Sequence, residues 1–312
     1  MPDSTSRSMH FADRLTAAVR EKRNPVVVGL DPRWEQLPPP LTVGIAAGDR
    51  AAMAKVYFRF CADVIDVVAN LVPAIKPQAA FFEQLGPDGM VALGELIRHA
   101  RKQGLLVILD GKRNDIGSTA TAYAEGYLGE ESAWRADALT VSPYLGADSI
   151  QPFVEVARDR GAGLFVLVKT SNLGGGQFQD LNTDGQPLYR RVAGFVEQLA
   201  METAAGQSYG AVGAVVGATY RDQLEELRSV MPHAWFLVPG YGSQGATGRD
   251  VAGAFDEEGL GAVVNNSRGI LFAYRRRGFE ERFGAARWQE AVAAATHEMI
   301  DELRAETHAG RL

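Results

Sequence analysis

The sequence predicts a (β/α)8 barrel, in which eight parallel strands, each followed by a helix, close into a cylinder. Three observations support this prediction: apolar runs rich in β-branched residues recur along the chain, helical stretches separate them, and polar residues end most of them. Strict alternation of strands and helices is typical of parallel βαβ units. A doubly wound open sheet is the alternative, and the count of eight strands favours the barrel. No linker interrupts the series, so we expect residues 1–312 to form a single barrel domain.

The predicted strands are short runs dominated by valine, leucine and isoleucine. β-branched residues favour strands, and an uninterrupted apolar run is expected where a parallel sheet is covered on both faces. In chain order the runs are PVVVGLD (25–31), PAIKP (73–77), LLVILDGK (105–112), ALTVSP (138–143), GLFVLVKTS (163–171), GAVGAVVGAT (210–219), WFLVPG (235–240) and GAVVNNSRG (261–269).

Helical stretches lie between these runs and are long enough to connect parallel strands. They are expected around 49–70, near 87–103, near 117–128, at 150–161, near 188–204 and at 221–230. The stretch 172–191 is rich in Gly, Asn and Asp, and we expect a long loop there, after the fifth strand. In a barrel this loop lies on the active-site face.

Composition excludes several classes of function. The chain is 46% hydrophobic and 22% charged, which is ordinary for a soluble globular protein. Its net charge of −6 gives no basic surface for nucleic acid or an anionic membrane. One cysteine, Cys61, rules out an internal disulfide framework and a cysteine-based metal cage. We find no signal peptide and no apolar span of 18 residues, so we expect a cytoplasmic protein.

Polar residues at the strand ends are the functional candidates, because the carboxyl ends of all barrel strands meet at one mouth. A single charged residue in such a place is commonly just the start of a solvated loop, and Asp31 could simply cap a turn. Lys76 is harder to explain in this way, because it lies between Ile75 and Pro77. The full set is Asp31, Lys76, Asp110, Lys112, Ser142, Lys169, Thr170, Ser171, Gln244 and Arg268.

Gln244 and Arg268 lie in glycine-rich stretches after the seventh and eighth strands. Glycines let backbone N–H groups approach an anion, and barrels frequently bind phosphate in this place. An arginine adds a forked donor suited to phosphate oxygens. These two residues therefore indicate a phosphate site.

The stretch DGKRNDIG (110–117) carries the densest cluster of charges. Asp110 and Lys112 are two positions apart, so on an extended strand both face the mouth, beside Lys76 of the neighbouring strand. Asp115 follows three positions later. Such an array can keep its members charged, hold a proton ready for delivery and present a fixed carboxylate. An exposed cluster of ion pairs would not explain the five apolar residues that precede it.

DGKRNDIGST resembles the D-x-K-x-x-D-I-x-N-T signature of the orotidine 5′-phosphate decarboxylase family. The resemblance extends from GLDPR through AIKPQAAFFE, SPYLG, VKTSN and PGYGSQG to NNSRG, and the arrangement is similar to the longer bacterial subgroup. Ser118 departs from the signature, where the family has Asn, which affects only local hydrogen bonding in the loop. Several matches in the right order are far more specific than one short motif.

The resemblance implies cofactor-independent decarboxylation of orotidine 5′-phosphate to UMP, with neither a cofactor nor a metal. It also implies a role for each matching position. Lys76, Asp110, Lys112 and Asp115 form the catalytic array, with Lys112 protonating C6 of the pyrimidine as carbon dioxide leaves. Asp115 and Thr119 reach into a partner's site, so a homodimer with shared active sites is expected. The remaining substrate contacts are Asp31 to the ribose hydroxyls, Ser171 to the pyrimidine amide edge, and Gln244 and Arg268 to the 5′-phosphate.

Two rival functions fit parts of the pattern. A sister enzyme on the same scaffold, a sugar-phosphate decarboxylase or epimerase, would use the same D-x-K-x-x-D array with Mg²⁺. Lys76 argues against it, because a second cation would compete with the metal. A non-catalytic sensor of phosphate ligands is the other rival, and the presence of all four charged residues argues against it.

Overall fold

The computed structural model describes residues 10–46, 48–242 and 245–312, and it contains the predicted closed barrel of eight parallel strands. The strands lie in the order β1, β10, β9, β8, β5, β4, β3, β2, and β2 pairs with β1 to close the cylinder. Their bounds are β1 Val26–Leu30, β2 Ala74–Pro77, β3 Leu106–Arg113, β4 Ala138–Val141, β5 Gly163–Lys169, β8 Val212–Val216, β9 Phe236–Val238 and β10 Ala262–Asn266.

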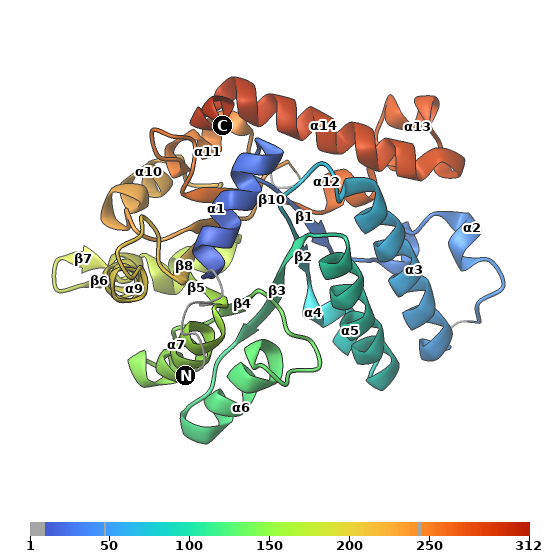
Figure 1. Cartoon of the computed structure of the whole chain (residues 1–312). Helices are drawn as coiled ribbons and strands as arrows, with labels where there is room; N and C mark the ends of the chain where they lie inside the picture. The colour runs from blue at the N-terminus through green and yellow to red at the C-terminus, as the bar shows by residue number, and fades with distance from the viewer. Residues whose placement is uncertain (1–9, 47, 243–244) are drawn as a thin grey trace, which may run out of the picture.

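Helices surround the barrel, and the longer ones lie close to the predicted bounds (Figure 1). The α-helices are α1 Phe11–Lys22, α2 Pro39–Thr42, α3 Arg50–Val68, α4 Ala79–Glu83, α5 Pro87–Lys102, α6 Gly117–Leu128, α7 Ala147–Arg160, α8 Gly176–Gln179, α9 Leu188–Thr203, α10 Arg221–Val230, α11 Gly248–Val251, α12 Arg268–Leu271, α13 Phe279–Arg282 and α14 Trp288–Glu306. Short 3₁₀ turns occupy Trp34–Gln36, Leu173–Gly175, Ala252–Ala254, Ala273–Arg275, Ala285–Arg287 and His308–Arg311. No helix in these described ranges is both long and apolar enough to span a bilayer.

Helix α1 closes the amino-terminal end of the barrel. Phe11 and Leu15 are buried with the inward-facing side chains of the strands. The ring of Phe11 meets that of Phe165 edge to face, with centroids 5.9 Å apart. Gly163 at the start of β5 makes this approach possible, since a Cβ there would lie 2.1 Å from the Phe11 ring. The carboxyl end of the barrel is therefore the end that stays available for a site.

The stretch 172–191 is more regular than the predicted loop, which corrects that expectation. It holds a 3₁₀ turn, the short helix α8, and a hairpin of β6 (Asn182–Thr183) and β7 (Gln186–Pro187) before α9 begins. Asp184 and Gly185 at the hairpin turn both have positive φ, 51° and 87°. An Asp-Gly pair favours this type of two-residue turn, so the hairpin could have been predicted from the sequence.

Candidate active site

A cavity of about 700 Å³ opens at the carboxyl end of the barrel. On one side it is lined by neighbouring strands: Lys76 of β2, Asp110 and Lys112 of β3, and Thr140 of β4. Further residues come from β5, β8 and β9 and from the segment that follows β5, namely Leu167, Thr170, Ser171, Asn172, Gly174, Gly175, Gln177, Phe178, Gln179, Val215, Leu237 and Pro239. Charged groups and apolar side chains thus share one cavity.

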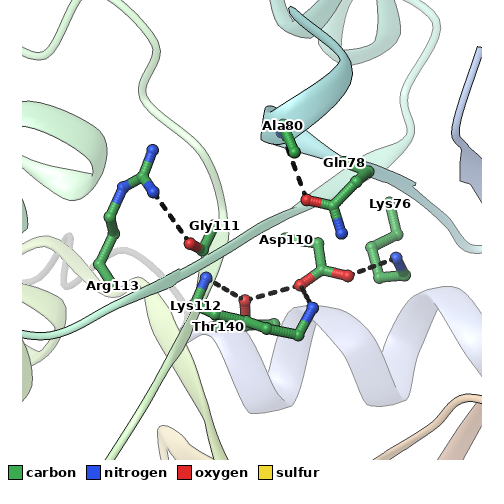
Figure 2. Close-up of polar contacts among 8 residues, drawn as sticks. All are labelled: Lys76, Gln78, Ala80, Asp110, Gly111, Lys112, Arg113 and Thr140. Atoms are coloured by element: carbon green, nitrogen blue, oxygen red, sulfur yellow. Dashed lines mark hydrogen bonds and ion pairs between the residues drawn. The ribbon is translucent and has the colours of Figure 1, made fainter. Parts of the chain in front are cut away.

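Asp110 is the centre of the polar network (Figure 2). Lys76 Nζ lies 2.7 Å from Asp110 Oδ2, and Lys112 Nζ lies 2.6 Å from Oδ1. The hydroxyl of Thr140 donates a third hydrogen bond, of 2.9 Å, to Oδ1. The side chains of Lys76 and Asp110 are only 5% and 9% exposed, so their pairing has little competition from water. One carboxylate therefore orients both ammonium groups.

The charges in this network support one another. Burial alone would raise the pKa of Asp110, but the ammonium groups of Lys76 and Lys112 outweigh it and hold the pKa well below its usual range. Burial alone would lower the pKa of Lys76, but the carboxylates of Asp110 and Asp31 raise it above its usual value. Both groups are therefore ionised at neutral pH, because each offsets the desolvation of the other.

Lys112 has a left-handed backbone, with φ of 46°, in a place where the register of β3 against β4 shifts. This corrects the sequence-based geometry, which assumed an extended strand at Asp110 and Lys112. Only glycine adopts this conformation without steric cost, so a lysine there must be held by its surroundings. The Lys112 N–H donates a hydrogen bond of 2.9 Å to the hydroxyl of Thr140. Thr140 therefore fixes both the backbone of Lys112 and the carboxylate of Asp110.

Arg113 holds the same turn from its other side (Figure 2). One guanidinium nitrogen donates to the carbonyl of Gly111 at 3.0 Å. Another donates to the hydroxyl of Tyr127 at 3.0 Å and pairs with Glu83. The peptide group between Gly111 and Lys112 is thus held at both ends, its carbonyl by Arg113 and its N–H by Thr140. Thr140 and Arg113 are site residues that sequence reasoning missed.

Ser171 lies in the same cavity as the three charged residues, as the resemblance implies. Asp31, directly after β1, lies near enough to Lys76 to raise its pKa. One carboxylate oxygen of Asp31 is buried and accepts no hydrogen bond from the residues that the structure describes. Asp31 is not among the described residues that line the first cavity.

Arg268 begins α12 and lines a neighbouring cavity of about 540 Å³ with Gly242 and Asn266. Gln244, its predicted partner in phosphate binding, lies outside the described residues. Asp115 and Thr119 are not among the described residues that line the first cavity. Asp115 accepts a hydrogen bond of 2.8 Å from the N–H of Ile116, and Thr119 is exposed on the first turn of α6. One chain thus brings together Lys76, Asp110, Lys112 and Ser171.

The comparisons with known proteins all indicate the same family. The family model described as "Orotidine 5'-phosphate decarboxylase / HUMPS family" matches residues 24–278. The orotidine 5′-phosphate decarboxylase of Rhodopirellula baltica is 56% identical over 300 residues, which cover 95% of this chain and 99% of the relative. That of Deinococcus radiodurans is 43% identical over 290 residues, covering 93% and 96%.

Solved structures agree with the sequence relatives. A putative orotidine 5′-phosphate decarboxylase from Streptomyces avermitilis superposes with a TM-score of 0.79 at 36% identity, over 98% of this chain and 99% of that one. The Leishmania donovani OMP decarboxylase gives a TM-score of 0.74 at 33% identity, covering 96% and 98%.

Proposed function

The chain belongs to the orotidine 5′-phosphate decarboxylase / HUMPS family and has the decarboxylase activity of pyrimidine biosynthesis, and from this premise we propose how its residues act. Lys112 delivers a proton to C6 of the pyrimidine as carbon dioxide leaves. Lys76 and Asp110 hold its ammonium group in place. The observation that carries this proposal is the buried Asp110 carboxylate, which bridges the ammonium groups of Lys76 and Lys112.

The reaction requires fixed electrostatics. Breaking the bond between C6 and the carboxyl carbon leaves an electron pair at C6 in the plane of the ring, where no adjacent carbonyl can accept it. A preorganised positive charge stabilises that pair as it develops, and the pair then takes a proton from the same ammonium group. Lys112 is suited to both tasks, because Asp110 and Thr140 already fix it before substrate arrives. No cofactor is needed for this chemistry.

We assign the remaining substrate contacts from the family pattern and the cavities. Ser171, which lines the cavity, contacts the amide edge of the pyrimidine, and Asp31, close to Lys76, binds the ribose hydroxyls. Arg268, together with Gln244, binds the 5′-phosphate. The apolar side chains of Leu167, Val215 and Leu237 offer a surface for the flat pyrimidine ring in the same cavity.

We further propose a homodimer with shared active sites, in a single cytoplasmic domain that spans residues 1–312. In this dimer Asp115 and Thr119 of one copy complete the site of the other. Two observations support the arrangement: Asp115 does not line its own chain's cavity among the described residues, and Ile116 beside it is 56% exposed. In such a dimer the other copy would remove the exposed Ile116 side chain from water.

The test is an absorbance assay with orotidine 5′-phosphate, run with and without a chelator. We expect loss of the substrate's ultraviolet band at equal rates in both. Turnover of a keto-sugar phosphate that requires Mg²⁺, with no effect on orotidine 5′-phosphate, would contradict the proposal. Tight binding of UMP without any turnover would indicate the sensor instead.

A further inference from the structure

The segment that follows β5 is anchored by a buried lysine. Lys169, the last residue of β5, is 1% exposed. Its ammonium lies 2.5 Å from the carboxylate of Asp180, eleven positions further along the chain. The same ammonium lies over the rings of Tyr220 and Tyr189, with 4.8 Å and 5.4 Å to the centroids. Among the described residues, the lysine is therefore enclosed by two aromatic rings and the carboxylate of Asp180.

Lys169 does not belong to the catalytic array, although it ends β5 and Lys76 lies next to the end of β2. The pairing of β5 with β8 shifts in register between Leu167 and Lys169. Leu167 still lines the cavity, whereas the Lys169 side chain lies against Tyr189 of α9 and Tyr220. Thr170 and Ser171, the next two residues, line the cavity again. At the end of β5 the side chain of Lys169 therefore lies away from the cavity, whereas Thr170 and Ser171 line it.

A second contact closes the segment into a loop. The N–H of Thr170 donates to the side-chain oxygen of Gln179 at 3.0 Å, and the amide nitrogen of Gln179 donates back to the Thr170 hydroxyl at 2.8 Å. Gln179 is directly beside Asp180, so the ion pair and the paired hydrogen bonds act at the same place. Both ends of segment 170–180 are therefore fixed to the end of β5.

This closed loop forms one wall of the substrate cavity. Gln177, Phe178 and Gln179 line the cavity together with Ser171. Phe178 is 63% exposed, so little of this wall is held by burial in the core, and contacts to β5 are what fix it.

We propose that Lys169 and Asp180 form a latch that holds segment 170–180 as a wall of the substrate cavity, which makes Lys169 a positioning residue for the reaction. The proposal rests on the proposed function, because it assigns the wall to the orotidine 5′-phosphate site. The physical basis is the position of Lys169: a buried ammonium that loses the carboxylate paired with it, here that of Asp180, is strongly destabilised, so the closed arrangement of the loop is favoured. A small displacement of a positioning element can change the rate greatly.

The experiment compares four variants with the wild-type protein. Asp180→Asn removes the charge of the latch, and Lys169→Met replaces the ammonium by an apolar chain of similar length. The double variant removes both charges, and Lys169→Arg keeps a cation. The matched control is Asp184→Asn, which breaks the exposed pair of Asp184 with Arg191 (2.8 Å) in the hairpin of the same stretch.

Activity and local opening are both measured. We expect Asp180→Asn to lower kcat/KM by about tenfold to a hundredfold, mainly through KM. Lys169→Arg should restore most of the loss that Lys169→Met causes, and the double variant should be less impaired than the two single losses multiplied together. Hydrogen exchange in residues 172–180 should rise in Asp180→Asn and stay unchanged in Asp184→Asn.

Different results would contradict the proposed function and the proposed latch. A wild-type protein that leaves orotidine 5′-phosphate unchanged defeats the proposed function, and the exchange data then still test the latch. Active wild-type protein, with Asp180→Asn equal to it in both KM and exchange, defeats the latch alone. A fall in thermal stability of Asp180→Asn with unchanged KM and exchange shows a merely structural ion pair and also overturns the proposal.

Discussion

Thr140 offers the sharpest test of how the site is organised. Its hydroxyl accepts the N–H of Lys112 and donates to Asp110 Oδ1, each at 2.9 Å, and the residue is 1% exposed. Thr140→Val keeps a similar shape and removes both contacts. A hydrogen bond to a charged group contributes about 1.5–3 kcal/mol and one between neutral groups about 1 kcal/mol. The Lys112 turn, with φ of 46°, then loses one of the contacts that hold it.

We expect Thr140→Val to reduce kcat by about 10- to 100-fold, which corresponds to about 1.4–2.7 kcal/mol of transition-state stabilisation. KM should change little, because the ammonium groups stay available to an anionic substrate. The assay is the loss of substrate absorbance at saturating concentration, with urea unfolding as a check of the fold. Thr140→Ser is the control, since it keeps the hydroxyl. If the valine variant matched the serine variant in kcat, the Thr140 hydroxyl would have no part in positioning Lys112.

Four further predictions follow from the site. Lys112→Ala should abolish decarboxylation and leave the unfolding transition unchanged, and near-normal turnover would remove Lys112 as the proton donor. Arg268→Ala should raise KM by about tenfold or more, as loss of a charged contact to phosphate predicts, so an unchanged KM would count against the phosphate site. Mixing inactive Asp115→Ala with inactive Lys76→Ala protein should restore activity, whereas a mixture that stays inactive despite subunit exchange would exclude shared sites. The folded-state pKa of Asp110 is depressed, so its network stabilises the protein above the unfolded pKa of about 4 and loses this contribution as pH falls toward the folded value. The free energy of unfolding, measured by urea titration from about pH 5 to pH 2, should therefore depend less on pH in Asp110→Asn than in the wild-type protein.

The barrel and the three central charges could be predicted from the sequence because each depends on local patterns. The strands are separate apolar runs, and the carboxyl ends of parallel strands must meet at one mouth. Lys76, Asp110 and Lys112 were predicted to lie together on this basis, and the structure places them within hydrogen-bonding distance. The resemblance to a known family then gave the chemistry that spacing alone left open.

The contacts that hold these charged side chains in place could not be predicted in the same way. Thr140 lies between Leu139 and Val141, where a β-branched residue simply suits a strand, so nothing marks its hydroxyl as functional. The left-handed turn at Lys112 has no sequence signal either, because the residue is a lysine and not a glycine. Such features arise from tertiary contacts: Thr140 lies 28 positions from Lys112 along the chain and meets it only through strand pairing.

The charge balance of the cavity connects these supports to the proposed dimer. Within one chain Asp31 also lies close enough to Lys76 to raise its pKa, and Asp110 already accepts hydrogen bonds from Lys76, Lys112 and Thr140. The Asp110 carboxylate therefore serves first to orient the two lysines. A further carboxylate, from Asp115 of another copy, would fix the free side of the Lys112 ammonium, whose side chain is still 46% exposed. The exposure of Lys112 in the single chain is thus the feature that a shared active site would remove.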